Sequence, residues 1–566
     1  MTLRPGWFQE YSPANQRLFD QIFALIEKNY QQSGYDHIAT PAVEKVDILK
    51  KGGSEVANQI FGLYGLAQWG EDTKDYALHF DLTVPFARYV LDWKNDLAFP
   101  FKRYQIQPVW RGERSQKGRY KEFWQADIDT IRPSSQNSPE INSFYAIETV
   151  STLGKTISQI FSHFNLSKKF SIRLSHKQFL KGLIDGLGEK NPQAMISFLD
   201  KFYKLTPEIQ AQEIQKFPGL AEALSALIAN QIDQLPSAIR ENNDFQQGRN
   251  TIQTVIQTIH DLYPEIKILF DPTIVRGLDY YTGIVFETFI EERLDLGSFC
   301  SGGAYENFTD FIDAKHSLSW IGGSIGLSRL FSILTEDFAI QPASEDDSYM
   351  VMHFEWMTND ALHLASQFQK ANKSAFVYPS PVKLGKQFEY AQKKWVTSVV
   401  ICGEAEKLSN TFKIKNLNSG KETTLFFEEA FGIIPVYKDS SEKKILLIKN
   451  KNWWHRGFPK GRPDESDRNA QHSALRELAE ETGITDCQIV EKNNQPLIFT
   501  ENYLVPGKKL KQVTYFVGLV SSLTTNLQES EIADARRCEL SEALELISFP
   551  EAKALVSQLA KLGEEI

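Results

Sequence analysis

The chain has 566 residues, a formal net charge of −10 and a hydrophobic content of 42%. A typical domain holds roughly 100–200 residues, so this length predicts about three or four domains, and the mixed composition excludes an intrinsically disordered chain. Because the chain is acidic overall, nucleic-acid binding would need local basic patches, such as Lys117–Lys121 and Lys413–Lys415 with Lys421.

The cysteines and the apolar runs bear on the compartment. Cys300, Cys402, Cys487 and Cys538 are scattered, with no CxxC pair and no metal-ligand spacing, which favours a reducing compartment and argues against a structural zinc site. The first residues, MTLRPGWFQEYSP, lack the apolar core of a signal peptide. No apolar run approaches the roughly 20 residues that a membrane span needs. We therefore expect a soluble cytoplasmic protein.

The N-terminal third combines one long helix with strands. Asn15–Ser33 has a helical apolar face that Gly34 ends. Strands are predicted at the following segments: Tyr35–Thr40, Tyr76–Asp81, Lys102–Trp110 and Glu122–Ile131. In the last of these, Phe123, Gln125, Asp127 and Asp129 alternate with other residues. This period of two indicates antiparallel strands with one polar face, which suits the floor of a polar site.

The middle of the chain is mostly helical. Lys177–Leu262 reads as an inserted helical module, after which strand patterns return at Ile266–Leu269 and Ile284–Phe289. Ser324–Leu334 is predicted to be a helix entered through a glycine turn, and the polar, proline-containing segment Glu336–Ser348 a linker.

Beyond the linker, short strands alternate with helices, which indicates a small α/β domain. Its predicted strands are Tyr349–His353, Ala375–Tyr378 and Ser398–Cys402, and its helices are Asn359–Lys370 and Leu384–Lys394. A further α/β segment starts near Phe426, with strands near Ile433–Tyr437 and Lys444–Lys449.

Three motifs of the first half fit nucleotide chemistry. They are RGERSQKGRYKEFWQ from Arg111 to Gln125, RGLDYYTG from Arg276 to Gly283, and GGSIGLSRL from Gly322 to Leu330. Arginine matches phosphate geometry, Phe123 offers a flat apolar face for a base, and carboxylates accept hydrogen bonds from an ammonium or an imidazole N–H. A single surface arginine, or a single glycine-containing turn, would not by itself indicate nucleotide binding.

Together these motifs resemble the histidyl-tRNA synthetase family. FKRYQIQPVWRGERSQKGRYKEFWQADID resembles its motif 2, RGLDYYTG its histidine-specific signature and GGSIGLSRL class II motif 3. LHFDLTVPFARY is similar to its substrate-binding segment and CSGGAYENF to its second signature. The resemblance covers roughly residues 1–425. It departs from the family at Ser115, where proline is common, and at Ala304, where arginine is usual.

The resemblance implies a role for each matching residue. Arg111 and Arg329 would clamp the ATP phosphates, Phe123 would stack on adenine, and Arg276 would bind the α-phosphate. Asp81, Gln125 and Asp129 would hold the histidine ammonium and nearby groups, and Tyr280 and Tyr281 would lie around the histidine side chain. The resemblance also assigns Leu82, Thr83 and Glu113 to the binding of histidine or ATP.

The implied activity is ATP-dependent ligation of histidine to tRNA(His) through histidyl-adenylate, by a homodimer. The alternative is the family's regulatory paralogue, which senses histidine without charging tRNA. Arg276 and the anticodon-type features of residues 347–425 favour the ligase.

The C-terminal segment carries an acidic helix after the sequence FPKG (Phe458–Gly461). In RELAEETGI, Glu477, Glu480 and Glu481 have the i, i+3 and i+4 spacing that places them on one helical face. Three carboxylates on one face repel one another unless a cation lies among them, and Mg²⁺ prefers such oxygen ligands together with substrate phosphates. The plain alternative is a solvated acidic helix.

This pattern resembles the Nudix box, and FPKG its diadenosine-polyphosphate hydrolase branch; ESEIADARRCELSEAL, with Glu531, resembles the end of that branch. The resemblance implies Mg²⁺-dependent hydrolysis with Glu480 and Glu481 as catalytic groups. Arg468 stands where a glutamate is usual, and Gly461 lies one residue early, so Asp464, Glu465 or Asp467 is expected to replace the missing acid. A catalytically weak nucleotide-binding module is the reading that Arg468 supports.

The expected fold class is therefore α/β and α+β multidomain. An antiparallel class II synthetase core is predicted at residues 1–335 with a helical insert at about 177–262. A small α/β anticodon-binding-like domain is predicted at 347–425, and an α/β/α Nudix-like domain at 428–566.

Overall fold

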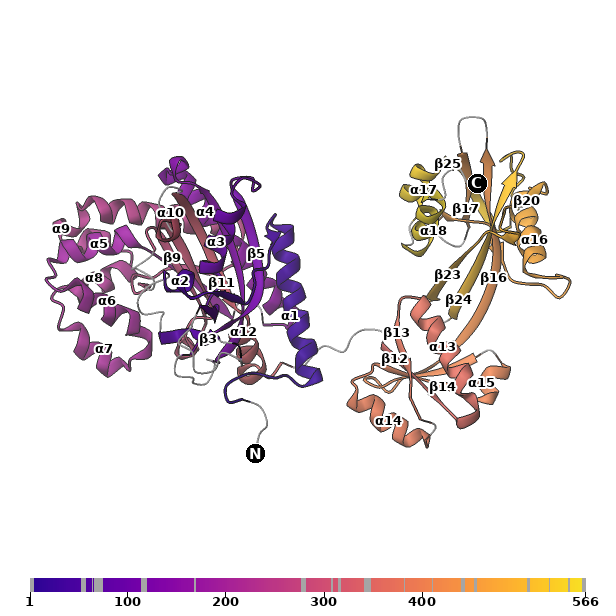
Figure 1. Cartoon of the computed structure of the whole chain (residues 1–566), viewed down its shortest axis with the longest axis horizontal. Helices are drawn as coiled ribbons and strands as arrows, with labels where there is room; N and C mark the ends of the chain where they lie inside the picture. Colours follow the sequence, from indigo (N-terminus) through magenta and orange to yellow (C-terminus); the bar gives the residue numbers. More distant parts are fainter. Residues whose placement is uncertain are drawn as a thin grey trace. The chain divides into compact units, whose positions relative to one another are not determined.

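The computed structural model of the chain divides into two compact units, Met1–Pro342 and Ala343–Ile566 (Figure 1). The residues that the structure describes are 5–51, 58–63, 65, 75–112, 120–166, 169–275, 281–306, 309–313, 317–340, 348–380, 382–409, 411–438, 443–451, 456–505, 509–528, 530–547 and 550–561. Each unit is treated by itself below.

The first unit is built on a mostly antiparallel sheet, as the alternating pattern predicted. Among the described residues it has eight strands in the order β1-β5-β6-β11-β10-β9-β7-β8, and the pairs β1–β5 and β7–β8 at its two ends are parallel. The strands are β1 Asp36–His37, β5 Phe101–Trp110, β6 Glu122–Pro133, β7 Phe170–His176, β8 Ile268–Phe270, β9 Ile284–Ile290, β10 Cys300–Glu306 and β11 Leu318–Gly326.

The alternation along β6 separates the two faces of this sheet. Ala126 and Ile128 are fully buried in the main core, together with residues of α1 (Pro13–Gln32) and α4 (Pro139–His163), which cover that face. The odd-numbered residues of β6 point to the opposite face, where the polar site lies. Ser12 caps α1 by accepting a hydrogen bond from the Asn15 backbone N–H, and this fixes where the helix begins.

A small three-stranded sheet and two helices lie beside the polar face. Its order is β2-β4-β3, with β2 Val43–Lys45, β3 Phe61–Leu63 and β4 Tyr76–Leu78. The helices are α2 (Val46–Lys50) and α3 (Thr83–Trp93). Phe86 and Val90 of α3 pack with Trp320 and Ile131 against one end of the large sheet.

The predicted helical insert has two small cores of its own, one around Phe179 and Phe245 and another around Met195 and Leu220. Its α-helices are α5 Lys177–Leu187, α6 Pro192–Lys201, α7 Pro207–Ile214, α8 Leu220–Ile228, α9 Ser237–Arg240 and α10 Asn243–Leu262.

The glycine-rich segment before Arg329 differs from its prediction. Ser324–Leu334 was predicted to be a helix entered through a glycine turn, but Gly322, Gly323 and Gly326 all lie in strand β11, and α12 covers only Leu327–Ser332. A Cβ at Gly322 would overlap the carboxylate of Asp129 on β6. The glycines therefore allow close packing within the sheet, and a turn is not their role. A π-helix, Ile333–Asp337, follows α12.

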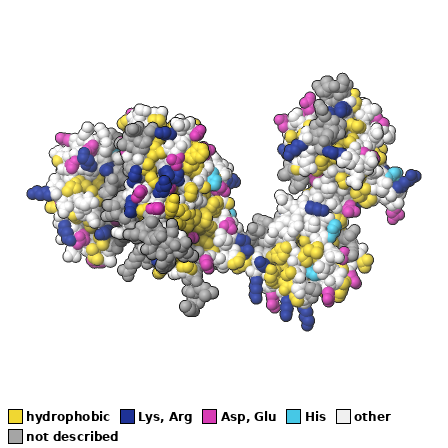
Figure 2. Space-filling view, viewed as in Figure 1, with side chains coloured by type: hydrophobic (Ala, Val, Ile, Leu, Met, Phe, Trp, Pro, Cys, Tyr) yellow, Lys and Arg dark blue, Asp and Glu magenta, His cyan; other side chains and the backbone are white. Residues whose placement is uncertain are grey.

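The second unit begins with the predicted small α/β arrangement, which we call the anticodon-type part (residues 348–425). Strand β12 (Ser348–His353) pairs in parallel with both β13 (Ser374–Val377) and β14 (Ser398–Cys402), and β15 (Thr411–Asn416) joins antiparallel to β14. Its helices are α13 Thr358–Lys370, α14 Leu384–Lys393 and α15 Glu404–Leu408. Figure 2 shows lysine and arginine side chains along the lower edge of this unit, where Figure 1 places α14.

One strand continues from the anticodon-type part into the rest of the unit. Strand β16 spans Glu422–Lys438, and the strand predicted at Ile433–Tyr437 is only its last part. Its first residues pair with β15, and Phe426–Val436 pair in parallel with Lys509–Leu519 of β24. Leu510 of β24 is buried in the same core as Val351 of β12 and Phe368 of α13. The sheet is therefore continuous through the junction.

The remaining residues, 428–561, form what we call the Nudix-type part, in which helices lie on both sides of the shared sheet (Figure 1). Its strands beyond β16 include β17 Lys443–Asn450, β18 Arg456–Gly457, β19 Lys460–Gly461, β20 Cys487–Ile489, β23 Ile498–Val505, β24 Lys509–Val520 and β25 Ile532–Glu539. A two-residue pair, β21 (Glu491–Lys492) with β22 (Gln495–Pro496), stands apart from the sheet. The helices are α16 Ala470–Thr482, α17 Leu540–Leu546 and α18 Pro550–Lys561.

The four cysteines, all of them described, are free thiols. Of the described helices, not one is both long and apolar enough to cross a membrane.

Candidate active sites

Arg111 marks one end of the polar site in the first unit. It directly follows β5, and its guanidinium lies over the ring of Phe123 with 5.0 Å between the guanidinium carbon and the ring centroid. Its Nε donates to the backbone carbonyl of Phe80 at 3.0 Å. The strand pairing of β5 with β6 places both residues at the same end of the sheet, as the motif 2 resemblance predicted. A cation and an aromatic face are thus presented together.

Asp81 lies next to Arg111, just before α3. Burial raises the pKa of Asp81 to about 6, although the Val84 backbone N–H and the Arg111 charge lower it. The Val84 N–H donates to the Asp81 carboxylate at 3.2 Å, so this carboxylate also supports the first turn of α3, which includes Thr83. Leu82 is fully buried.

The polar face of β6 forms the floor of the site. Asp129 is 4% exposed and accepts a hydrogen bond from the indole N–H of Trp320 at 2.6 Å. The guanidinium of the fully buried Arg103 lies 2.5 Å from the same carboxylate. Gln125 donates from Nε2 to the Ser324 hydroxyl at 3.0 Å. Burial raises the pKa of Asp129 to about 7, against the lowering effect of Arg103.

Sequence reasoning did not single out Asp127 or Arg103 as site residues. Asp127 lies between Gln125 and Asp129 on the same face of β6 and is 4% exposed. The period-two alternation contained the signal for Asp127. Arg103 could not be found in this way, because only the pairing Arg103↔Asp129 between β5 and β6 brings the two charges together.

Of the other residues predicted for this site, the structure describes Tyr281 and Arg329. Glu113, Arg276 and Tyr280 lie outside the described residues. Tyr281 packs near Tyr305 with ring centroids 5.5 Å apart. Arg329 of α12 donates to the backbone carbonyl of Leu296, next to a cavity that Glu287 and Ser298 line.

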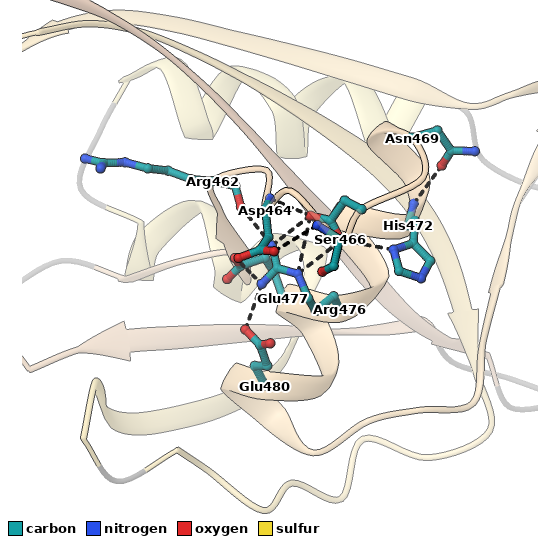
Figure 3. A network of polar contacts seen from close by, with 9 residues as sticks. Arg462, Asp464, Ser466, Asn469, His472, Arg476, Glu477 and Glu480 are labelled. Carbon is teal, nitrogen blue, oxygen red and sulfur yellow. Dashed lines mark hydrogen bonds and ion pairs between the residues drawn. The ribbon is translucent and has the colours of Figure 1, made fainter.

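In the second unit, Arg476 forms ion pairs with acidic side chains of helix α16. Asn469 caps α16 by accepting a hydrogen bond from the His472 N–H, and Gly483, at φ 76°, ends the helix as predicted. Arg476 Nη1 lies 2.9 Å from both Glu477 and Glu480. Figure 3 shows Arg476 in the middle of this network, with Glu480 one turn further along the helix.

Asp467 occupies the place of the missing acid. Its carboxylate accepts hydrogen bonds from Arg476 Nε at 3.1 Å and from Nη2 at 3.0 Å, and its side chain is 3% exposed. Arg476 and further hydrogen bonds lower the pKa of Asp467. Arg468 is exposed. Of the three acids that the sequence left open, Asp467 is therefore the one that fixes Arg476.

The carboxylates of α16 and the loop before β25 repel one another. The pKa of Glu481 is raised to about 7, chiefly by burial and also by the charges of Glu477 and Glu531, although the Lys460 N–H donates to Glu481 at 2.8 Å. Glu477 lies against Gly461, where a Cβ would overlap its carboxylate.

The fit of these carboxylates to a divalent cation rests on their chemistry. In the part of the chain that the structure describes, no three acidic, histidine or cysteine side chains are already arranged as a metal site. The donor set nevertheless fits Mg²⁺, because it is made of carboxylate oxygens whose mutual repulsion a cation would relieve.

A basic cluster lies on the shared sheet close to these carboxylates. Glu428 of β16 lies 2.5 Å from Lys509, 3.0 Å from Lys511 and 2.5 Å from Arg462. Burial would raise the pKa of Glu428, but these three cations lower it to about 2. Burial and the charge of Lys511 lower the pKa of Lys460, whereas the charges of Glu481 and Glu477 raise it. Three cationic side chains, those of Arg462, Lys509 and Lys511, therefore surround the single carboxylate of Glu428.

Comparisons with known proteins match most of the chain. Residues 7–330 match a family model described as histidyl-tRNA synthetase, residues 338–436 one described as anticodon binding domain, and residues 427–559 one described as NUDIX domain. A histidine–tRNA ligase of Finegoldia magna is 34% identical over 75% of this chain and 97% of that protein. One of Clostridium tetani is 33% identical over 76% and 98%. The crystal structure of the histidyl-tRNA synthetase from Nostoc sp. PCC 7120 covers 75% of this chain and 97% of its own, with a TM-score of 0.64 and 28% identity.

The sheet-based core, the anticodon binding domain and the site of the first unit define an aminoacyl-tRNA synthetase, to which a NUDIX domain is joined. Within that class, the chain belongs to the histidyl-tRNA synthetase family.

Proposed function

We propose that the first unit activates histidine with ATP and that the chain then transfers histidine to the 3′ end of tRNA(His). The observation that carries this proposal is the buried polar face of Gln125, Asp127 and Asp129 beside the Arg111–Phe123 pair. Buried carboxylates attract the ammonium of an amino acid, and an arginine next to a half-buried aromatic ring suits an adenine nucleotide.

In the first step, a carboxylate oxygen of histidine attacks the α-phosphorus of ATP, and pyrophosphate leaves. Positioning and charge stabilisation supply most of the catalysis in such a step. Arg111 and Arg329 hold phosphates, Arg276 stabilises the α-phosphate, and Phe123 stacks on adenine. Histidine and nearby groups are held by Asp81, Leu82, Thr83, Glu113, Gln125, Asp129, Tyr280 and Tyr281.

The test is ATP–pyrophosphate exchange by the full chain with and without histidine. Exchange that requires histidine, and that other amino acids do not support, is the expected result. Folded protein without any exchange would instead favour a histidine-sensing regulatory role.

We propose further that the Nudix-type part hydrolyses a nucleoside polyphosphate such as diadenosine tetraphosphate. Glu477, Glu480 and Glu481 would hold Mg²⁺, which when bound would neutralise phosphate charge and orient the attacking water. We assign Glu480 and Glu481 as the catalytic carboxylates, as the resemblance of RELAEETGI to the Nudix box implies. The cations around Glu428 favour a ligand with several phosphates. Attack of ATP on an aminoacyl-adenylate would generate such a dinucleotide within the same protein.

Hydrolysis of diadenosine tetraphosphate by the full chain, with Mg²⁺ or with EDTA, tests this second activity. We expect Mg²⁺-dependent release of nucleotides that Glu481→Gln abolishes. If the wild-type chain binds the dinucleotide but leaves it intact, the Nudix-type part is a nucleotide-binding module only.

The assembly and compartment follow from the family resemblance. We propose that the chain acts as a cytoplasmic homodimer whose substrates are ATP, histidine and tRNA(His). Sedimentation of the purified protein tests the dimer, and a monomer with full charging activity would contradict it.

A further inference from the structure

The turn that follows β8, the last strand of the eight, is held by the carboxylate of Asp271. Its Oδ1 accepts hydrogen bonds from the Thr273 backbone N–H at 2.9 Å and from the Thr273 hydroxyl at 2.7 Å. The Ile274 N–H donates to the Asp271 carbonyl at 3.2 Å, which closes a turn of four residues. An aspartate that bonds the backbone two residues ahead fixes the direction of the chain. Ile274 and Val275 are 3% and 2% exposed, so the chain that leads to Arg276 is packed as far as Val275.

The other oxygen of Asp271 binds two side chains from elsewhere in the first unit. Arg173 of β7 donates from Nη1 to Asp271 Oδ2 at 2.9 Å, and the Tyr203 hydroxyl donates to the same oxygen at 2.5 Å. Arg173 Nη1 also donates to the Tyr203 hydroxyl at 2.5 Å, so the three groups form a closed triangle. Asp271 is 5% exposed, and charge-assisted hydrogen bonds are strong where water is excluded. A shift of the turn would therefore break contacts with both Arg173 and Tyr203.

Tyr203 brings the helical insert into this network. It belongs to the 3-10 helix Phe202–Lys204, which directly follows α6. Its ring packs against Phe289 of β9 with the ring centroids 5.7 Å apart. The guanidinium carbon of Arg173 lies 5.0 Å from the ring centroid of Tyr203. The insert is thus joined to the catalytic sheet at the turn that Asp271 holds.

The value of this network lies in geometry more than in stability. A buried ion pair adds little net stability, because the loss of hydration of both charges offsets their attraction. The turn that it fixes ends close in sequence to Arg276, the proposed ligand of the α-phosphate. A displacement of about 1 Å in a group that orients reactants can slow a reaction on the order of 100-fold. The position of Asp271 in the chain therefore indicates a role in catalysis.

We propose that Asp271 is a positioning residue for histidine activation, which sets the course of the chain that leads to Arg276. Arg173 and Tyr203 hold Asp271 in place, and through Tyr203 the helical insert takes part in the activation step. This inference rests on the proposed activation of histidine and on the proposed role of Arg276 in it.

The test measures ATP–pyrophosphate exchange by the full chain carrying Asp271→Asn or Tyr203→Phe. Asp271→Asn keeps the size of the side chain but places an amide N–H against donors of Arg173 or Thr273. We expect it to lower kcat by roughly 10–100-fold and to leave the KM for histidine nearly unchanged. Tyr203→Phe keeps the ring on Phe289 and removes one hydroxyl, so kcat should fall by roughly three- to tenfold. This milder variant keeps the test readable if Asp271→Asn does not fold.

Asp244→Asn is the matched control within the insert. Lys181 Nζ of α5 lies 2.5 Å from the carboxylate of Asp244 on α10, so this pair joins two helices of the insert to each other. Its loss weakens a contact inside the insert without touching the turn after β8. We expect the kcat of exchange to stay at the wild-type value.

Combination with Arg276→Lys separates positioning from a merely stabilising role. Because Asp271 acts through Arg276, Asp271→Asn should lower kcat far less in the Arg276→Lys background than in the wild type. The inference is wrong if Asp271→Asn lowers only the thermal unfolding midpoint, if the two substitutions multiply in kcat, or if Asp244→Asn loses as much activity. Wild-type kcat in Tyr203→Phe would exclude the insert from this role. Failure of the proposed function looks different, since the wild-type chain itself would then show no histidine-dependent exchange.

Discussion

Asp467 shows how a departure from a motif can leave its geometry intact. The residue at the usual acidic position is Arg468, which is exposed, yet the Arg476 guanidinium donates hydrogen bonds to the carboxylate of Asp467, the residue before Arg468. Gly461 lies one residue earlier than the motif expects, so the loop before α16 is one residue longer than in the motif. Arg476 in turn contacts Glu477 and Glu480 and so orients two of the proposed metal ligands.

We expect Asp467→Asn to reduce the hydrolytic activity of the Nudix-type part by about 10–100-fold, the usual effect of removing a group that orients metal ligands. Diadenosine tetraphosphate hydrolysis in the presence of Mg²⁺ measures it. The matched control is Glu465→Gln, since Glu465 is an exposed acid of the same loop and should be replaceable without loss. Equal activity of the two variants would contradict the role of Asp467.

Glu481 is expected to make stability depend on pH in the absence of metal. Its pKa is raised from 4.5 to about 7, chiefly by burial, so the folded state favours its protonated form. The resulting stabilisation is complete below about pH 4.5 and is lost as the pH rises through about 7; it amounts to at most about 3 kcal/mol. In EDTA, Glu481→Gln should therefore unfold near the wild-type temperature at about pH 5 and above it at about pH 8. A difference that does not change with pH would contradict this assignment.

The sequence predicts which residue types form the two sites, but it does not predict which charged side chains pair with one another. Gln125 and Asp129 were expected in the first site from the motif alone. The engagement of Asp129 by Arg103 depends on cross-strand register, and the closeness of Asp467 to Arg476 depends on the path of a loop. Both are long-range geometry that no local pattern contains.

Among the elements, the strongly periodic segments were predicted well. Strand Lys102–Trp110 corresponds to β5 (Phe101–Trp110), and helix Asn359–Lys370 to α13 (Thr358–Lys370). The helix predicted at Ser324–Leu334 is present from Leu327 onward, but the glycine turn predicted before it is wrong, because Gly322 lies in a strand and makes room for Asp129 on the next strand. Contact between β6 and β11 overrides the local preference.

Strand β24 is expected to matter for tRNA charging although it belongs to the Nudix-type part. Leu510 is 1% exposed and packs with Leu364 and Phe368 of the anticodon-type part. Leu510→Ala should destabilise that core by roughly 2–5 kcal/mol. We expect a several-fold loss of tRNA charging with unchanged ATP–pyrophosphate exchange, because Arg111 and the polar face lie in the first unit.

The control for this substitution is Leu408→Ala. Leu408 also belongs to the second unit but is 89% exposed, so its truncation should change neither reaction. If Leu510→Ala charges tRNA like the wild type, β24 is not required by the anticodon-type part.

For the whole molecule, the continuous sheet predicts that the second unit unfolds as one. Val556 of α18 is fully buried in the core formed with Ile434 and Val513, far along the sheet from β12. Val556→Ala should speed hydrogen exchange on the order of tenfold in segment 348–353 as well as in segment 470–482. Exchange in β5 and β6 of the first unit is the internal reference and should not change.

Hydrogen exchange of the full chain, followed by mass spectrometry of its peptides, measures these segments separately. Faster exchange confined to the Nudix-type part would mean that the two parts open independently despite the strand that they share.

The unbroken run of β16 also constrains the length of the chain at the junction. A flexible connector tolerates an added or deleted residue, but side chains alternate along a strand, so a one-residue change near Phe427 would turn every residue on one side of it to the opposite face. Either Leu425 would leave the core that it shares with Phe368, or Ile434 would leave the core that it shares with Val513. Insertions and deletions at this junction should therefore be tolerated in pairs and rejected singly, and a swap of one NUDIX domain for another would succeed only in the matching phase.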